Sequence, residues 1–301
     1  MNILVSDGIE DIGKKILTEA GHNVVDKKFT PEELLKEIPN YDAIIVRSAT
    51  KVTKEVIDAG KNLKVIARGG VGLDNIDVAY AESKGIKVLN TPGASAISVA
   101  ELAIAHMFAL CRFLHVSTSE MRNLKWPKKE YSKGIELTGK TLGIFGLGNI
   151  GREVAKRAIG LGMKVIAYDP IVKQTDLQVK LTSQEEVLTQ SDIITLHIPY
   201  DKKVGAVITK KEFDMMKKGV ILINCARGGV ISEKDLLEAL KSGKVAAAGI
   251  DVFENEPPTE AQKELLNHPN VSATPHIGAS TVEAQERVGE EIAQKVINAL
   301  K

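Results

Sequence analysis

Three charged side chains in the second half of the chain, Arg227, Glu256 and His276, each follow an apolar, strand-like run. A guanidinium binds a carboxylate through two parallel hydrogen bonds and polarises a neighbouring carbonyl. An imidazole passes a proton to or from a hydroxyl oxygen, and a carboxylate beside it raises its pKa and fixes its orientation. Together they have the chemistry that hydride transfer on a hydroxy acid requires. Taken singly, they are equally consistent with a salt-bridged arginine, a solvated glutamate and a histidine satisfied in the core.

A glycine-rich turn earlier in the chain indicates where a cofactor for such chemistry would bind. The run TLGIFGLGNIGREVA carries Gly146, Gly148 and Gly151, and a second apolar run ends in Asp169, close to the expected spacing of about 20 residues. The glycines permit a tight turn, a close approach of pyrophosphate to the backbone and close helix packing. The helix N-terminus presents free N–H groups and a positive dipole end to the phosphates. The alternative is a strand-to-helix connection whose glycines serve packing only.

Asp169 predicts which dinucleotide binds. A carboxylate at this position accepts hydrogen bonds from the adenosine ribose hydroxyls and repels a 2′-phosphate. The next two residues, Pro170 and Ile171, offer no positive charge. We therefore expect NAD rather than NADP.

The first 90 residues alternate charged, helix-compatible segments with five short apolar runs: NILVS, HNVV, AIIVR, KVIAR and KVLN. Such alternation predicts a parallel sheet covered by helices on both faces. No glycine signature follows the first run, so we expect an α/β unit without a dinucleotide site. An apolar stretch at residues 95–114 predicts a long connecting helix, and residues 281–300 predict a last helix that packs back on this first unit.

The middle of the chain, residues 95–280, continues the alternation and predicts a doubly wound sheet of about six parallel strands. The carboxyl ends of parallel strands share one edge of the sheet, which is where ligands bind in such folds. We therefore expect Arg227, Glu256 and His276 to converge beside the glycine motif.

Two segments of the first unit also have ligand-binding chemistry. Arg47 follows the third apolar run, where a guanidinium suits a carboxylate or phosphate; a surface salt bridge is the simpler alternative. Residues 68–75, RGGVGLDN, hold three glycines in four positions, which favours exposed N–H groups and an anion nest. A flexible loop explains that composition equally well.

Residues 120–140 are polar and basic, and they hold the only tryptophan, Trp126, among Lys125, Lys128 and Lys129. A solvated loop or a subunit contact is the simplest interpretation. The alternative is a contribution to the site of an anionic ligand.

Composition limits the class of protein. The chain has 301 residues, enough for two domains, and a net charge of +1, which gives no case for nucleic acid or a membrane surface as a partner. Its two cysteines, Cys111 and Cys225, form neither a disulfide framework nor a zinc pattern, so we expect no metal and a reducing compartment. The first residues have no signal-peptide pattern, and the longest apolar stretch is too short to span a bilayer. We expect a cytoplasmic protein.

Several long motifs resemble those of the D-isomer-specific 2-hydroxyacid dehydrogenases: GLGNIGREVA, NCARGGVISEKDLLEAL, AGIDVFENEPP and TPHIGAST. Three further runs are similar, more narrowly, to the phosphoglycerate dehydrogenases within that family: RSATKVT, RGGVGLDNID and WPKKEYSKGIELTGKTLGIFGLGNIGREV. The resemblance extends over essentially the whole chain.

The resemblance implies an α/β fold of two doubly wound parallel-sheet domains. A flavodoxin-like substrate domain would comprise residues 1–94 plus 281–301, and an inserted Rossmann NAD-binding domain would comprise residues 95–280. It also implies a homodimer built largely on the Rossmann domains. The implied reaction is NAD-dependent oxidation of a phosphorylated 2-hydroxy acid at the entry to serine biosynthesis.

The resemblance also assigns roles to single residues. Arg227 would bind the substrate carboxylate, His276 would be the acid–base, and Glu256 its partner. Asp251 would hold the nicotinamide carboxamide. The other expected cofactor-binding residues are Val71, Gly146, Gly148, Asn149, Ile150, Gly151, Tyr168, Asp169, Pro170, His197, Ile198, Pro199, Cys225, Ala226, His276, Gly278 and Ala279. The expected substrate-binding residues are Arg47, Ser48, Gly70, Val71, Gly72, Arg227 and His276.

The chain departs from its resemblance at two points. Many family members have asparagine where this chain has Ser95, which puts polar contacts beside the substrate in doubt. The chain stops at Lys301, so we expect no serine-binding regulatory domain and no serine feedback. Two alternatives stay open: a glyoxylate or hydroxypyruvate reductase, with the same catalytic residues, and a non-catalytic NAD-sensing corepressor.

Overall fold

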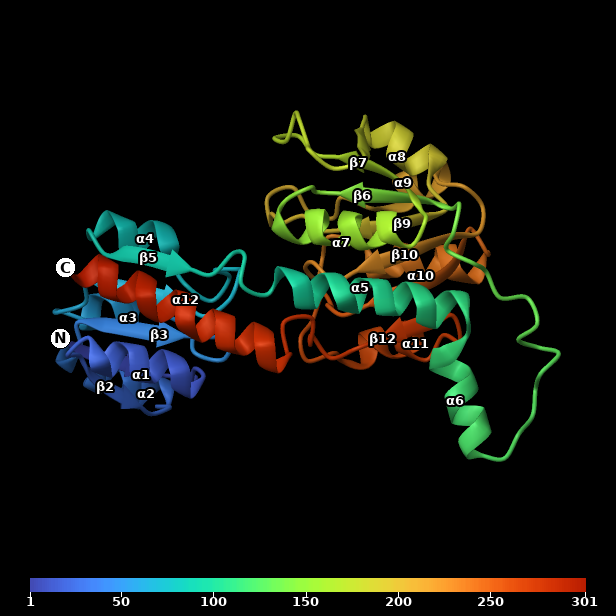
Figure 1. Cartoon of the computed structure of the whole chain (residues 1–301). Coiled ribbons are helices and arrows are strands. Elements are labelled where there is room, and N and C mark those ends of the chain that lie inside the picture. The colour runs from blue at the N-terminus through green and yellow to red at the C-terminus, as the bar shows by residue number, and fades with distance from the viewer. The chain divides into compact units, whose positions relative to one another are not determined.

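The computed structural model describes all residues from Met1 to Lys301, and the chain divides into two compact units. The first unit comprises Met1–Ala96 and Ala279–Lys301, and the second comprises Ile97–Gly278. Each unit is a parallel sheet with helices on both faces, as Figure 1 shows. The predicted fold class of two doubly wound parallel-sheet domains is therefore confirmed. The boundaries of the first unit differ from the predicted ones by two residues. Its first segment ends at residue 96 instead of 94, and its second segment begins at residue 279 instead of 281.

The sheet of the first unit has five parallel strands in the order β2-β1-β3-β4-β5, which is the flavodoxin-like order. The central strands are apolar on both sides because helices cover both faces. The strands are β1 (Asn2–Val5), β2 (Asn23–Asp26), β3 (Ala43–Val46), β4 (Val65–Arg68) and β5 (Lys87–Asn90).

Helices of the first unit bury one apolar stripe each. One core contains side chains of α2, α3 and α4, and the other contains side chains of α1 and the C-terminal helix α12. Gly13 and Gly289 let α1 and α12 pack closely, since a Cβ on Gly13 would lie 2.7 Å from the Gly289 carbonyl oxygen. The helices are α1 (Asp11–Glu19), α2 (Pro31–Glu37), the 3₁₀ turn η1 (Ile38–Asn40), α3 (Lys54–Ala59), α4 (Val78–Ser83) and α12 (Val282–Leu300).

The sheet of the second unit has seven parallel strands in the order β12-β11-β10-β9-β6-β7-β8. The strand order reverses between β6 and β9, the position where dinucleotide-binding folds open their crevice. The prediction of about six strands missed the edge strand β8, whose three residues, VKL, carry no apolar run. The strands are β6 (Thr141–Phe145), β7 (Lys164–Tyr168), β8 (Val179–Leu181), β9 (Ile193–Leu196), β10 (Val220–Asn224), β11 (Val245–Ile250) and β12 (Val271–Ala273).

Helices α5 and α7 cover one face of this sheet, and α8, α9, α10 and α11 cover the other. Their bounds are α5 (Ala96–Cys111), α6 (Leu114–Arg122), α7 (Asn149–Gly160), α8 (Gln184–Gln190), α9 (Lys210–Met215), α10 (Glu233–Lys241), η2 (Glu260–Gln262) and α11 (Lys263–Leu266).

The predicted connecting helix at residues 95–114 is shorter than expected. It breaks after α5 at Phe113, whose φ is 58°, and α6 leaves in a new direction. No single helix is long and apolar enough to cross a membrane. Only α5 and α6 taken together reach the required length and hydropathy, and the pair is bent by 64°.

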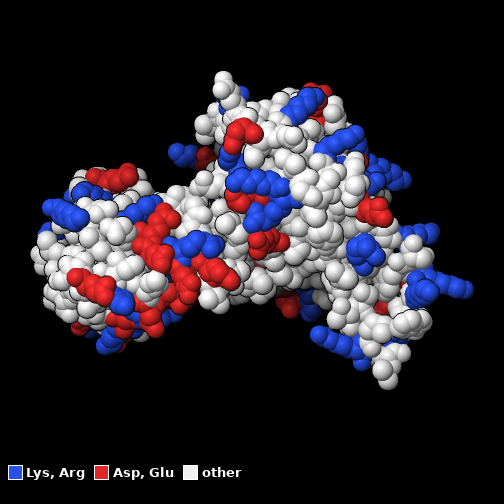
Figure 2. Space-filling model, viewed as in Figure 1, with Lys and Arg blue, Asp and Glu red and all other residues white.

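Charge is unevenly distributed over the first unit. Figure 2 shows Asp and Glu side chains gathered over the region of α12 and α1. Helix α12 contributes the exposed side chains of Glu283, Glu286 and Glu290 to this acidic surface.

Candidate active site

Three neighbouring strands of the second unit end at the same edge of its sheet. Strand β10 ends at Asn224, β11 at Ile250 and β12 at Ala273, and all three are parallel. The loops that follow them carry Arg227, Glu256 and His276. The structure thus brings the three predicted side chains to one edge of the sheet.

His276 and Glu256 form a direct pair. Nδ1 of His276 lies 2.6 Å from Oε2 of Glu256, and both side chains are partly exposed. The hydrogen bond to Glu256 raises the pKa of His276, and burial opposes that rise only in part. Burial alone would raise the pKa of Glu256, but hydrogen bonds from His276 and from the Phe253 N–H, at 3.0 Å, lower it. The pair therefore favours a charged imidazolium beside a carboxylate.

Arg227 is held by its own loop. The Asn224 side chain donates to the Arg227 carbonyl oxygen at 3.0 Å and accepts from the Ala226 N–H at 3.1 Å. The positive charge of Arg227 reaches both partners of the pair, since it lowers the pKa of Glu256 and of His276. The next residue, Gly228, allows the loops after β10 and β11 to touch, because a Cβ there would lie 1.7 Å from the Phe253 carbonyl oxygen.

Asp251 anchors the segment that carries His276. Its carboxylate is buried and accepts hydrogen bonds from the Thr274 hydroxyl at 2.6 Å and from the Ile277 and Gly278 N–H groups, both at 2.8 Å. His276, between these residues, has a φ of 53°, in the left-handed region that costs most side chains energy. Asp251 thus holds His276 in a backbone conformation that the loop alone would not favour.

The glycine turn after β6 fits a dinucleotide. Gly146 has a φ of +88°, and a Cβ there would lie 2.6 Å from the His197 carbonyl oxygen. A Cβ on Gly151 would lie 2.0 Å from the Gly146 carbonyl oxygen, so α7 can approach the strand only because this position is glycine. A Cβ on Gly148, in contrast, would meet nothing within 4 Å. That open space lies at the start of α7, where no side chain caps the backbone N–H groups, as a pyrophosphate requires.

Asp169 follows β7 and is braced by three backbone groups. Its carboxylate accepts from the N–H groups of Leu147 at 2.7 Å, Ile171 at 2.8 Å and Val172 at 2.9 Å. Burial opposes its ionisation, but these bonds lower its pKa. Of roughly four acceptor positions on a carboxylate, three are occupied, which leaves one for a ribose hydroxyl.

Lys173 lies near this position. Its ammonium donates to the Pro170 carbonyl oxygen at 2.7 Å. Pro170 and Ile171 carry no charge, but Lys173 places a cation close to Asp169 that the prediction of NAD specificity did not include.

The other expected cofactor-binding residues of the second unit lie beside the same strands. Asn149 and Ile150 open α7, while Tyr168 ends β7 and packs edge-on against Phe145, with ring centroids 6.1 Å apart. The segments after β9 and β10, with the segment that follows His276, supply the rest: His197, Ile198, Pro199, Cys225, Ala226 and Gly278. Ala279 is the first residue of the chain's return to the first unit.

In the first unit, Arg47 directly follows β3, and its loop is braced from two sides. Asp7 accepts from the N–H groups of Arg47 at 2.8 Å and Thr50 at 2.9 Å. The Asn75 amide donates to the carbonyl oxygens of the same two residues at 2.8 and 2.6 Å. Ser48, between them, is exposed. Neither Asp7 nor Asn75 carried a signal in the sequence, because their partners are distant along the chain.

The segment after β4 contains the predicted nest residues Gly70, Val71 and Gly72. Gly70 has a φ of +156°, and its carbonyl oxygen accepts from the Thr91 N–H at 3.0 Å. The Asn90 amide donates to the Val71 carbonyl oxygen at 2.6 Å, and the Arg68 guanidinium donates to that of Gly72. Because hydrogen bonds from Thr91, Asn90 and Arg68 hold all three carbonyl groups, this segment is ordered by contacts within the first unit.

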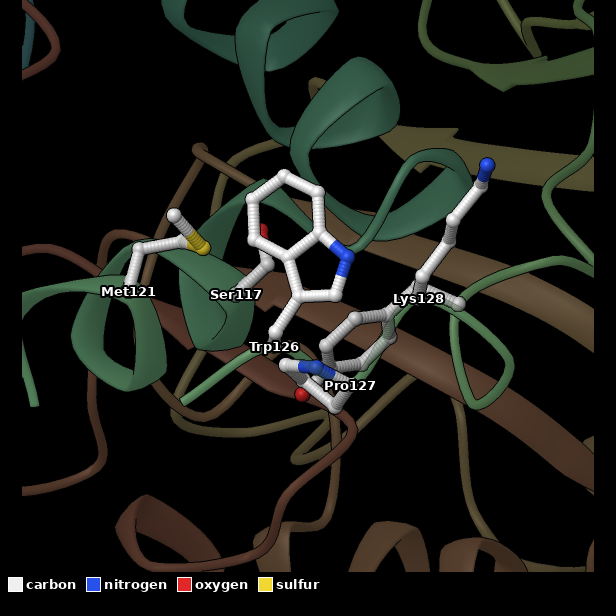
Figure 3. A pocket seen from close by; sticks show the side chains of 6 residues that line it. Ser117, Met121, Trp126, Pro127 and Lys128 are labelled. Atoms are coloured by element: carbon white, nitrogen blue, oxygen red, sulfur yellow. The ribbon is translucent and has the colours of Figure 1, made fainter. Parts of the chain in front are cut away.

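The basic segment after α6 forms a hollow of its own. Figure 3 shows the apolar side chains of Met121, Trp126 and Pro127 around a cavity of about 190 Å³, with Ser117 and Lys128 at its sides. Trp126 is 75% exposed. The hollow therefore has a mainly apolar lining.

The fold and these side chains define the second unit as the NAD-binding part of an oxidoreductase. Residues 104–278 match the family described as "D-isomer specific 2-hydroxyacid dehydrogenase, NAD binding domain". The chain belongs to this family. It is an NAD-dependent D-2-hydroxyacid dehydrogenase, NAD is its cofactor, and its substrate is a small 2-hydroxy acid.

Relatives and solved structures support this assignment. The chain is 55% identical over 92% of its length to a hydroxypyruvate reductase from Thermotoga maritima, of which it covers 90%. It is 47% identical over its full length to a D-3-phosphoglycerate dehydrogenase from Methanocaldococcus jannaschii, of which it covers 58%. A D-lactate dehydrogenase from Aquifex aeolicus, solved with NAD and lactic acid, is 33% identical with a TM-score of 0.85 and is matched over 98% of this chain and 94% of its own.

Proposed function

We propose that the chain oxidises 3-phospho-D-glycerate to 3-phosphohydroxypyruvate, the first step of serine biosynthesis. The observation that carries this proposal is the place of Arg47 directly after β3, in a loop whose backbone is braced by Asp7 and Asn75. Its guanidinium offers a fork of N–H donors, which suits a phosphate better than it suits an uncharged hydroxymethyl group. With Ser48, Arg47 would bind the phosphate end of the substrate, and the backbone of Gly70, Val71 and Gly72 would bind its carboxylate.

The residues of the second unit would perform the oxidation. Arg227 binds the substrate carboxylate and polarises the carbonyl that forms. Because Nδ1 of His276 is bonded to Glu256, Nε2 is the ring nitrogen that takes the hydroxyl proton. NAD, held at the glycine turn, would supply the acceptor for the hydride that leaves C2. The carboxylate of Glu256 would stabilise the imidazolium that results, and Asp251 keeps the His276 segment in place.

A hydroxypyruvate reductase is the second candidate. The specific observation in its favour is the 55% identity to the Thermotoga maritima protein over nearly the full length of both chains. The phosphoglycerate dehydrogenases, in contrast, are longer proteins, of which the chain spans about 58%. The two reactions have the same catalytic groups and differ in whether the substrate carries a phosphate.

Turnover of paired substrates separates the candidates. We expect kcat/KM for NADH formation to be higher with 3-phosphoglycerate than with D-glycerate, lactate or glycolate.

Arg47→Ala should lower kcat/KM for 3-phosphoglycerate about 10- to 100-fold, the size of one charge-assisted hydrogen bond, and leave kcat/KM for D-glycerate unaffected. Arg47→Lys should recover part of the loss, and Lys51→Ala, which removes a nearby exposed charge, should have no effect. Equal turnover of both substrates, or a preference for D-glycerate, would instead assign the chain as a hydroxypyruvate reductase.

A homodimer is the assembly that we propose. Large apolar side chains are concentrated on α6 and the segment after it: Leu114 is 53% exposed, Met121 47%, Leu124 94% and Trp126 75%. Exposed apolar side chains concentrated in one segment support a protein contact. Light scattering should give the mass of two chains, and Trp126→Glu should shift it towards one chain. Val204→Glu, at a side chain that is 70% exposed elsewhere, should not.

We also infer a cytoplasmic location. Both cysteines, Cys111 and Cys225, are buried free thiols, which suits a reducing compartment. Cell fractionation that found the protein in an oxidising compartment would contradict this inference.

A further inference from the structure

His106 is a buried histidine in α5 that the reaction described above does not use. The residue is 3% exposed. Both ring nitrogens have hydrogen-bond partners in the segment at the end of the second unit. Nδ1 lies 2.9 Å from the Ser272 hydroxyl, and Nε2 lies 3.1 Å from the Thr274 hydroxyl. Burial lowers the pKa of His106, which favours the neutral ring.

The Asp251 carboxylate determines which groups donate and which accept in the contacts of Thr274 and His106. The Asp251 carboxylate only accepts, so the Thr274 hydroxyl donates its proton to Asp251, at 2.6 Å. Thr274 therefore accepts from Nε2–H of His106. In the neutral ring Nδ1 is then the acceptor, and the Ser272 hydroxyl donates to it. The contacts thus specify one tautomer of His106.

The fold makes room for this histidine. A Cβ on Gly249 in β11 would lie 2.7 Å from the Cβ of His106, so only glycine lets the ring lie between α5 and the sheet. Helix α5 also holds the end of the same segment, since the Ser98 hydroxyl donates to the Gly278 carbonyl oxygen at 2.6 Å. The His276 segment is therefore attached to α5 at both of its ends.

We propose that His106 is a positioning residue that acts through Thr274 to orient the Asp251 carboxylate, and with it the backbone on either side of His276. Asp251 accepts from the N–H groups of Ile277 and Gly278, and under the proposed function it would also hold the nicotinamide carboxamide. A donor that fixes the Thr274 hydroxyl keeps the carboxylate in the orientation that serves both. This inference rests on the proposed roles of His276 and Asp251.

The test compares two replacements of His106. His106→Gln keeps an N–H donor at the reach of Nε2, and His106→Met fills the space without a donor. With the fastest 2-hydroxy acid of the substrate panel, we expect His106→Met to lower kcat about tenfold and to raise the Kd of NADH, measured by its fluorescence, several-fold. His106→Gln should stay within about twofold of the parent in both. His268→Gln, at a partly exposed histidine outside this network of contacts, is the matched control and should change neither.

A double-mutant cycle tests whether the effect passes through Thr274. In a Thr274→Val background, His106→Met should cost no further activity, because the group that received its hydrogen bond is absent. Equal losses in the Met and Gln variants, additive losses with Thr274→Val, or unchanged kcat and Kd in His106→Met would each overturn the proposal.

A measurement on the parent protein covers the case in which His106→Met does not fold. In ¹⁵N spectra of histidine-labelled protein without cofactor, the His106 ring, assigned by its loss in His106→Gln, should be neutral and protonated at Nε2. A ring protonated at Nδ1, or at both nitrogens near neutral pH, would overturn the inference. Because these readouts use whichever 2-hydroxy acid is oxidised fastest, or no substrate, they stand if 3-phosphoglycerate is not the substrate.

Discussion

Nδ1 of His276 lies 2.6 Å from Oε2 of Glu256, and the two residues follow different strands of one parallel sheet. The contact depends on two backbone arrangements: Glu256 also accepts from the Phe253 N–H, and Asp251 fixes the segment on both sides of His276. The carboxylate thus reaches the ring from a loop that is itself constrained. The protonation of His276 is therefore set by a pair and not by the histidine alone.

Glu256→Gln should shift the pH dependence of oxidation. His276 must be neutral to take the hydroxyl proton, so kcat/KM for oxidation rises as pH passes through its pKa, which the Glu256 hydrogen bond raises above the ordinary value of 6.5. Replacing the carboxylate by an amide weakens the hydrogen bond that is the largest cause of that rise and removes the negative charge that adds to it. The rise of kcat/KM for oxidation should therefore occur at lower pH in the variant. The reverse reduction needs the imidazolium, so the pH above which that activity is lost should fall as well.

Stability provides an independent check on the same pair. Because the pKa of His276 is higher in the folded state than its ordinary value of 6.5, protonation of this ring stabilises the fold. The contribution is complete below pH 6.5 and is lost as pH rises through the pKa of the folded state. Unfolding by urea should therefore show a larger Glu256→Gln destabilisation at pH 6 than at pH 9. A pH profile of the variant that matches the parent would show that Glu256 does not control His276.

His276→Ala should abolish most of the turnover without loss of cofactor binding. General acid–base catalysis contributes about 10²- to 10⁴-fold, so kcat should fall by that factor. The Kd of NADH should change little, since the ring does not hold the glycine turn. Near-normal turnover in the variant would remove His276 from the acid–base role.

The sequence patterns predicted the parts of this structure that depend on local periodicity. The strand-like runs before Arg227 and Glu256, VILIN and VAAAGI, are almost entirely apolar, which is typical of buried parallel strands, and parallel strands place their ends at one edge. The need for glycine at Gly151 was also predictable, because a Cβ there would meet the carbonyl oxygen of Gly146, a few residues earlier; the close contact of Gly146 itself is with His197, far along the chain.

Other features depend on contacts that no local pattern encodes. The break at Phe113 carries no glycine or proline, and β8 is three residues long. Asp7 and Thr50, or Thr274 and Asp251, meet only after the fold has formed, because more than twenty residues separate each pair. Buried polar groups need partners, yet the sequence does not say which partner each one finds.

Asp169→Ala should weaken the discrimination between NAD and NADP. The carboxylate that would repel a 2′-phosphate is lost, and the Lys173 ammonium, bonded to the Pro170 carbonyl oxygen, remains nearby as a cation. The ratio of kcat/KM for NAD over NADP should fall at least about tenfold. Lys173→Ala should have the opposite effect, and an unchanged ratio in Asp169→Ala would exclude the carboxylate as the selector.

The same residue contributes to stability with a defined pH dependence. Backbone hydrogen bonds, against the effect of burial, lower the pKa of Asp169 in the folded state, so its contribution is present above its ordinary value of 3.8 and is lost as pH falls through the folded pKa. The destabilisation by Asp169→Ala should therefore be largest near neutral pH and shrink below about pH 4. A destabilisation that is constant from pH 7 to pH 3 would contradict this assignment.

Gly148→Ala and Gly151→Ala form a matched pair that separates cofactor binding from packing. A Cβ on Gly148 meets nothing within 4 Å, so its substitution should change the free energy of unfolding by less than about 1 kcal/mol. Its methyl group would occupy the space that a pyrophosphate needs, and the Kd of NADH should rise at least about tenfold. A Cβ on Gly151 would lie 2.0 Å from the Gly146 carbonyl oxygen, so that substitution should destabilise the fold by about 2 kcal/mol or more. Urea unfolding and NADH titration measure both effects, and a Gly148→Ala protein that binds NADH like the parent would place the pyrophosphate elsewhere.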